Sequence, residues 1–134
     1  MTTAPPFDDA SESRLLRQIM VDTAGPHWNT RELRKQIQTT RLPFGQPVTD
    51  VFSRVHAALE RLGEVLDTDT ADADSRRVRA VLSEDDRPVV CTAWARTDGP
   101  LTILALRAAA PRVSWLDRGK AAGRTLDRLV AALR

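Results

Sequence analysis

The segment Trp28–Val65 places the tightest limits on how this 134-residue chain can fold. Two stretches within it carry apolar residues at helical spacing, and residues 43–47, which include two prolines and a glycine, separate them. We predict one helix over residues 29–40 and another over residues 49–62. Gly63 follows at the position where a helix commonly ends in a left-handed residue. The segment therefore predicts two short helices joined by a polar turn and followed by a strand.

Periodic patterns also cover most of the remaining chain. They predict a first helix at about residues 10–23, strands at 64–68, 76–83, 89–96 and 101–107, and a closing helix at about 115–133. Asp98-Gly99 is a strong hairpin signal between the last two strands. The predicted fold class is α+β, with a disordered tail at residues 1–8, a first unit at residues 9–83, and a hairpin with its helix at residues 84–134.

Composition excludes several classes of protein. Apolar residues make up 42% of the chain and charged residues 28%, which supports a packed core. The chain has neither the start of a signal peptide nor a membrane-length apolar run, so we expect a cytoplasmic protein. The single cysteine, Cys91, excludes an internal disulfide and is expected in the core.

No motif in the chain indicates catalysis or a cofactor. His27 and His56 each lack a second histidine at metal-binding spacing, and the former lies in a predicted loop. The acidic run DTDTADAD fails the EF-hand pattern, because its sixth residue is Asp72 rather than glycine and its twelfth is Val78 rather than glutamate. We therefore expect no catalytic site, no metal and no cofactor, and we interpret the acidic run as a solvated turn.

Three stretches of sequence together carry a resemblance to a known superfamily. NTRELRKQI supplies the second helix, PVTDVFSRVHAALERLGEV the third helix and its exit, and VLDTDTADADSRRVRAV a hairpin. This order over about residues 10–83 resembles the winged-helix (winged helix-turn-helix) superfamily of DNA-binding domains. The resemblance implies an N-terminal winged helix-turn-helix followed by a β-hairpin and a C-terminal helix. It also implies sequence-selective binding of double-stranded DNA, by a transcriptional regulator or a factor for plasmid or phage partition or replication control.

The resemblance implies a set of DNA contacts, because the third helix of such domains lies in the major groove. Arg54 and Gln46 would contact base edges, and Thr49 and Ser53 would hold phosphates. Arg31, Arg34, Lys35 and Arg41 would bind the backbone, and Arg61, Arg76, Arg77 and Arg79 complete the predicted contact set. The alternative interpretation is that these residues belong to ordinary solvated helix faces.

Charge at the predicted wing favours a second hypothesis. Asp67, Asp69, Asp72 and Asp74 surround the wing tip, where like charge would repel phosphates. Residues 1–83 contain 11 basic and 12 acidic residues, whereas residues 28–62 contain six basic and three acidic ones. The second hypothesis is therefore a protein–protein adaptor that has a winged-helix shape and does not bind DNA.

The closing helix also leaves two interpretations open. Its first half contains the small residues Gly119, Ala122 and Gly123, which permit another backbone to approach closely. The apolar stripe that continues from them either covers the preceding hairpin within the chain or forms a homodimer interface. A dimer would pair two recognition helices on a two-fold DNA site.

Overall fold

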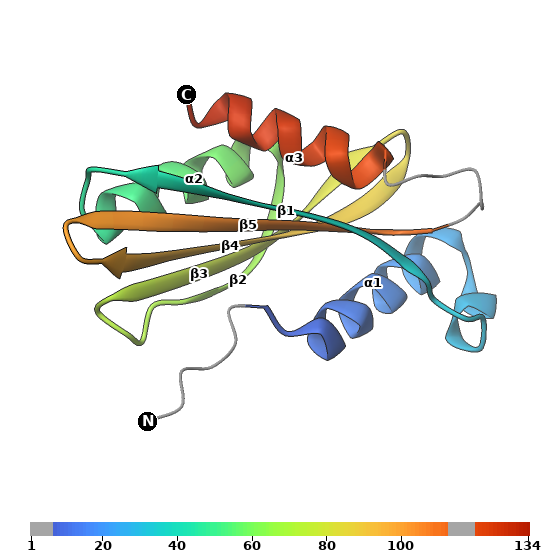
Figure 1. Cartoon of the computed structure of the whole chain (residues 1–134). Helices are drawn as coiled ribbons and strands as arrows, with labels where there is room; N and C mark the ends of the chain where they lie inside the picture. Colours follow the sequence, from blue (N-terminus) through green and yellow to red (C-terminus); the bar gives the residue numbers. More distant parts are fainter. Residues whose placement is uncertain (1–6, 113–119) are drawn as a thin grey trace.

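The computed structural model describes residues 7–112 and 120–134. In these residues five antiparallel strands form one sheet in the order β1-β5-β4-β3-β2, with α2 and α3 on one face and α1 on the other (Figure 1). The elements are α1 (Asp9–Ala24), the 3-10 turn η1 (Pro26–Asn29), β1 (Lys35–Phe44), α2 (Val48–Leu62), β2 (Gly63–Asp69), β3 (Ser75–Glu84), β4 (Arg87–Asp98), β5 (Leu101–Pro111) and α3 (Lys120–Ala132). The sheet therefore joins the first strand of the chain to the last.

The helix predicted at residues 29–40 is wrong, because the second half of this stretch belongs to the edge strand β1 and the first half contains no α-helix. The strand pairs with β5 along its whole length, from Lys35 opposite Pro111 to Phe44 opposite Thr102. The β-branched Ile37 suits this extended backbone, and an edge position tolerates Pro43. Without a second helix there is no helix-turn-helix. The winged-helix resemblance and the predicted fold class are therefore wrong.

The face that carries α2 and α3 holds the larger apolar cluster. Alternate residues of β3, β4 and β5 point into it, among them Val78, Ala93 and Leu106, each at most 1% exposed. Leu59 of α2 and Leu129 of α3 pack against them and are equally buried. Alanines on β4 and β5 let both helices approach the sheet closely. Burial of this apolar surface supplies the main driving force for the fold.

The other predicted elements are found with small shifts of their bounds. The helix at residues 10–23 is confirmed as α1, and that at 49–62 as α2. The closing helix is confirmed as α3 from Lys120, while its predicted start at 115–119 lies outside the described residues, as does most of the predicted tail. None of the described helices is long and apolar enough to cross a membrane.

The sheet continues across the predicted boundary between the two units of the chain. The predicted boundary between residues 83 and 84 lies at the end of β3, and β3 pairs with β4 from Ser75 opposite Arg96 to Glu84 opposite Arg87. The apolar stripe of α3, including Ala122, is buried against this same sheet. The described part of the stripe, from Ala121 to Leu133, is therefore packed within the chain.

The turn between β3 and β4 is tight, and two arginines of α3 bind its carboxylates. Asp85 and Asp86 both have positive φ, 50° and 63°, the conformation of a two-residue hairpin turn of type I′. Arg128 of α3 donates to the Glu84 carboxylate at 2.7 Å, and Arg124 pairs with Asp85. The carboxylates on the α3 side of this turn are therefore neutralised.

On the opposite face, α1 covers only a small apolar patch. Leu16 of α1 packs on Val90 of β4 and Ala109 of β5, and all three are fully buried. Leu15, Ile19 and other half-buried side chains surround them. This contact is much smaller than the apolar cluster under α2 and α3, so polar groups contribute more to the docking of α1.

Those polar groups form a partly buried set of charges, centred on Glu12, that we call the α1 ion cluster: Asp9, Glu12, Lys35 and Arg107. Glu12 is 2% exposed and accepts from Lys35 Nζ at 2.9 Å and from Arg107 Nε at 2.9 Å. Asp9 Oδ1 lies 2.5 Å from Lys35 Nζ and 2.9 Å from Arg107 Nη2. Lys35 comes from β1 and Arg107 from β5, so the cluster ties one helix to two strands.

Candidate functional site

The residues predicted to contact DNA are dispersed over the molecule. Lys35 is buried in the α1 ion cluster, and Arg79 pairs with Asp67 at 2.8 Å and donates to Ser11 at 2.7 Å. Arg31 lies 4.6 Å from the centre of the Trp28 ring. These side chains are therefore used within the fold.

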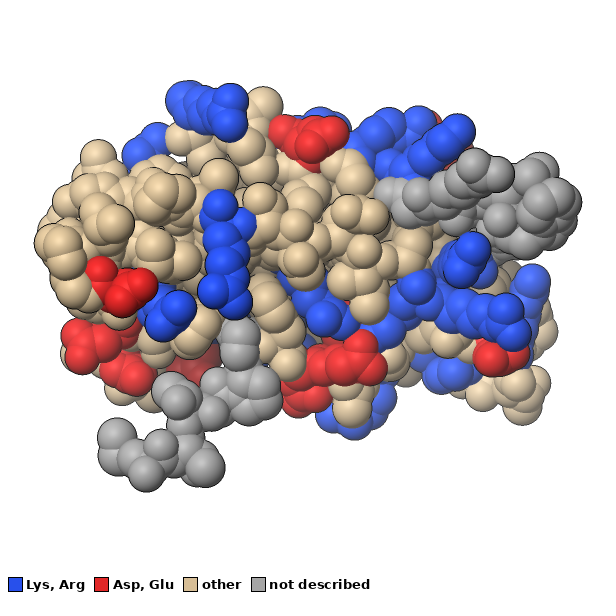
Figure 2. Space-filling view, in the orientation of Figure 1, with Lys and Arg blue, Asp and Glu red and all other residues tan. Residues whose placement is uncertain are grey.

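Other members of the predicted set lie on separate elements of the fold. Arg34 forms an exposed pair with Glu32 at 3.5 Å; Arg41 is exposed on β1; Thr49, Ser53, Arg54 and Arg61 are on α2; and Gln46 precedes that helix. Arg76 and Arg77, on β3, each have a buried Nε without a hydrogen-bond partner among the described residues. On the face drawn in Figure 2, basic side chains alternate with acidic ones and with uncharged surface.

Binding of double-stranded DNA is therefore the wrong interpretation. It depended on a recognition helix projecting from a helix-turn-helix, whereas α2 lies across a sheet and the preceding segment is a strand. Its base-reading residue Arg54 donates instead to the carbonyl of Leu133, at 2.5 Å. The adaptor with a winged-helix shape fails with the same architecture.

A groove with an apolar floor opens where α1 ends beside β2 and β3. We call it the α1–β2 groove; its volume is about 560 Å³. Its apolar lining comes from Ile19, Leu62, Leu66, Val81, Leu82 and Pro88, and its polar lining from Asp22, Thr23, Gly63, Glu64, Ser83 and Asp86. Most of the apolar side chains are only half-buried. The groove therefore offers apolar surface that the fold itself does not cover.

Local backbone features explain how this groove is assembled. Gly63 lies so close to β3 that a Cβ added to it would meet the carbonyl oxygen of Val81 at 2.2 Å, so only glycine allows this approach. The register between β2 and β3 then shifts between Val65 and Asp67, at Leu66. The tight turn after β3 directs Asp86 to the opposite rim.

The charge of the α1–β2 groove has one sign. Its lining contains three carboxylates and no basic side chain. Asp22 accepts from the Gln18 amide at 2.9 Å, while Glu64 and Asp86 have no ion-pair partner within residues 7–112 and 120–134. Because the neighbouring Asp85 is paired with Arg124, the unpaired negative charge is on the groove side of the turn.

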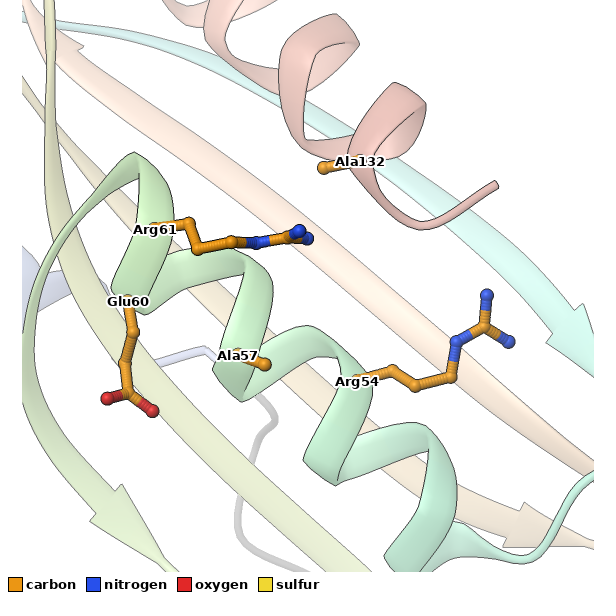
Figure 3. A pocket seen from close by; sticks show the side chains of 5 residues that line it. All are labelled: Arg54, Ala57, Glu60, Arg61 and Ala132. Carbon is orange, nitrogen blue, oxygen red and sulfur yellow. The ribbon is translucent and has the colours of Figure 1, made fainter.

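A second hollow lies on the other side of the molecule, between α2 and α3. We call it the α2–α3 groove; it has a volume of about 460 Å³ and is lined by Arg54, Ala57, Glu60, Arg61 and Ala132 (Figure 3). Both arginines extend from α2 toward α3 (Figure 3). The two grooves therefore differ in charge as well as in position.

Neither groove was predicted from the sequence, because each combines residues that are distant along the chain. The sequence did draw attention to Arg54 and Arg61, but for DNA. Glu12 was overlooked as well: a glutamate three residues after Asp9 is typical of a helix cap, whereas in the fold it is the buried centre of the α1 ion cluster. In the part of the chain that the structure describes, no group of side chains is suited to hold a metal ion.

Comparisons with known proteins give a weak structural likeness only. No protein-family model matches the chain, and no curated protein does. Among solved structures, Mll3558 from Rhizobium loti is 13% identical with a TM-score of 0.42, covering 77% of this chain and 97% of its own. A START superfamily protein from Mycobacterium smegmatis is 13% identical, with a TM-score of 0.40 and coverage of 72% and 93%. The Zhui aromatase/cyclase from Streptomyces is 12% identical, with a TM-score of 0.33 and coverage of 74% and 88%.

All three TM-scores lie below 0.5, so these likenesses do not assign the chain to a family. The architecture of this chain, with a strand where a second helix was expected, excludes a helix-turn-helix in residues 28–65.

Proposed function

We propose that this protein binds a small apolar molecule that carries a positive charge, in the α1–β2 groove. One observation supports this above all: an apolar floor of half-buried side chains is rimmed by Asp22, Glu64 and Asp86, with no basic residue in the lining. The proposed role is binding, and no reaction is assigned to the groove.

The floor of the groove supplies affinity for the apolar body of the ligand. Ile19, Leu66 and Val81 are each partly exposed to water in the unliganded protein. Covering them removes apolar surface from water, at about 25 cal/mol for each Å² buried. A volume of about 560 Å³ falls in the usual range for small-molecule sites.

The rim of the groove selects the charge of the ligand. A carboxylate that has no internal partner raises the local concentration of cations and disfavours anions. Glu64 and Asp86 line the groove from β2 and from the turn after β3, so an ammonium group above the floor would lie in the negative potential of both. This arrangement favours an amine over an alcohol or an acid of the same length.

The test compares three probes that share one chain length: octylammonium, octanol and octanoate, each titrated into the protein by calorimetry at neutral pH. We expect octylammonium to bind with the lowest Kd and octanoate with the highest. Equal affinity for octylammonium and octanol would contradict the role of the carboxylates. No heat of binding with any of the three probes would overturn the proposal.

Two variants and a control locate the binding. Glu64→Gln combined with Asp86→Asn should raise the Kd for octylammonium roughly fivefold to tenfold, since each exposed charge contributes about 0.2–1 kcal/mol. Thr23→Trp fills the groove without changing its charge and should abolish binding. The control, Asp127→Asn on α3, removes one carboxylate outside the groove. If the control weakened binding as much as the double variant, the effect would be one of net charge and not of this site.

A further inference from the structure

We infer that the α2–α3 groove is a second binding site, for a small organic dianion. It differs from the α1–β2 groove in location and in charge, so it does not depend on the function proposed above. Its lining is two arginines, two alanines and one glutamate (Figure 3). What each of these does in the fold decides what the groove can bind.

Arg61 is the recognition group that the fold leaves unused. It has no hydrogen-bond or ion-pair partner among the described residues, and it extends from α2 across the groove (Figure 3). A guanidinium presents a planar fork that matches a carboxylate or a phosphate with two parallel hydrogen bonds. The positive charge of Arg61 in this groove therefore favours the binding of an anion.

Arg54 has a different role, because one of its nitrogens is already engaged. It donates to the carbonyl of Leu133 at 2.5 Å, and its guanidinium carbon lies 5.5 Å from the centre of the Phe44 ring. This contact satisfies a carbonyl at the end of α3, where the helix dipole is negative and would repel an anion. Arg54 thus ties α2 to the end of α3 and offsets that negative end, while its other donors remain for a ligand.

Small side chains and the placement of Glu60 keep the groove open to an anion. Ala57 and Ala132 face the space from the two helices, and neither fills it (Figure 3). The Glu60 carboxylate lies 2.6 Å from Nδ1 of His56, one turn back on α2. In Figure 3 the Glu60 side chain is directed away from both arginines. The negative charge of Glu60 is therefore held outside the path between Arg54 and Arg61.

The spacing of the arginines selects a ligand with two anionic groups. They are seven residues apart on α2, hence on one side of the helix and separated by roughly 10 Å along its axis. A ligand with one anionic group reaches only one of them well. A ligand with two, linked by a short apolar chain over Ala57, reaches both.

The test titrates straight-chain dicarboxylates from glutarate to suberate, and hexanoate as the single-charge comparison, into the full chain. Binding is followed by calorimetry and by the NMR shifts of α2 and α3 amides. We expect one of the dianions to bind at least about tenfold more tightly than hexanoate, with an optimum chain length set by the spacing of the two arginines. Absence of binding by every dianion would overturn the inference.

Three variants make the result specific to the groove. Arg61→Gln should raise the Kd of the best dianion about tenfold, by loss of one forked contact. Ala57→Leu should abolish binding by filling the space while leaving every charge in place. The control, Arg14→Gln, removes the same charge from an exposed position on α1. Equal losses for Arg61→Gln and Arg14→Gln, or full binding by Ala57→Leu, would show that the groove is not the site.

Discussion

The two faces of the sheet hold their helices by different forces. Under α2 and α3 lies a continuous cluster of buried apolar side chains that draws on β3, β4 and β5. Under α1 the buried apolar contact reduces to Leu16, Val90 and Ala109, and beside it lies the α1 ion cluster. The stability gained from apolar burial does not require a particular orientation of the groups and does not change with pH. The stability gained from paired charges depends on the geometry of the pair and on the pH.

This contrast predicts an order in which the molecule opens. Local opening costs least where few apolar contacts are lost, so α1 should separate from the sheet before α2 and α3 do. The separation would also open one wall of the α1–β2 groove, since Ile19 and Asp22 belong to α1. The stability of α1 docking and the affinity for a groove ligand should therefore be linked.

The largest effect is expected from a change on the α2–α3 face. Leu129→Ala leaves a cavity beside β5 and the other strands, because Leu129 is 1% exposed, and should lower the free energy of unfolding by about 2–5 kcal/mol. Urea unfolding followed by circular dichroism measures it. A loss well below 1 kcal/mol would mean that this face can rearrange around the missing side chain, and the contrast between the faces would then be smaller than the burial indicates.

A smaller and more local effect is expected from Glu12→Gln. The amide keeps the shape of the side chain, but it removes the charge on which Lys35 and Arg107 converge. The free energy that holds α1 on the sheet should therefore fall by about 1–3 kcal/mol. Hydrogen exchange should show faster exchange of the α1 amides with little change in β4. The matched control is Glu32→Gln, which breaks the exposed pair with Arg34 and should have almost no effect. Uniformly faster exchange over the whole sheet would contradict a separate opening of α1.

The smallest effect on stability is a dependence on acid that belongs to the α1 face. The hydrogen bond and charge of Lys35, with help from Arg107, hold the pKa of Asp9 below its ordinary value of 3.8. Because the pKa is lowered in the folded state, Asp9 stabilises α1 docking fully above the unfolded value and loses this contribution as the pH falls through the folded one. The protection factors of the α1 amides, which correct the exchange rates for the pH dependence of intrinsic exchange, should therefore fall below about pH 4, and Asp9→Asn should flatten that change. An unchanged profile in Asp9→Asn would place the acid sensitivity elsewhere.

The sequence predicts the elements that have a local pattern, including α1, α2 and β3, better than it predicts the edge strand β1. The stripe of α2, with Val51, Val55 and Leu59, and the alternation in β3 are local patterns, and both elements were predicted with correct type. The error at β1 has a non-local cause. Leu33 and Ile37 have helical spacing, but pairing with β5 overrides it, and Ile37 ends 38% exposed rather than buried.

The candidate sites could be predicted only in part, because they too depend on contacts between segments that are distant along the chain. Arg54 and Arg61 share one side of α2 by simple periodicity, so their proximity was readable from the sequence. Their location opposite Ala132 was not, because it depends on how α3 crosses the sheet. The α1–β2 groove needs three segments to meet at Gly63, and a glycine in a sequence does not reveal which carbonyl approaches it.

The thiol of Cys91 can report which face opens. Its side chain belongs to the apolar cluster under α2 and α3, and burial raises the pKa of the thiol to about 12. A disulfide reagent at pH 8 therefore reacts only with molecules in which that face has opened, since the thiolate is the reactive form. We expect Leu129→Ala to accelerate labelling by about 30-fold or more, in proportion to its loss of stability, when opening is fast relative to labelling. Glu12→Gln should leave the rate close to that of the unmodified chain, because α1 separates from the other side of β4. If Glu12→Gln accelerated labelling as much as Leu129→Ala, the two faces would open as one unit, and the ion cluster would stabilise the whole sheet instead of one helix.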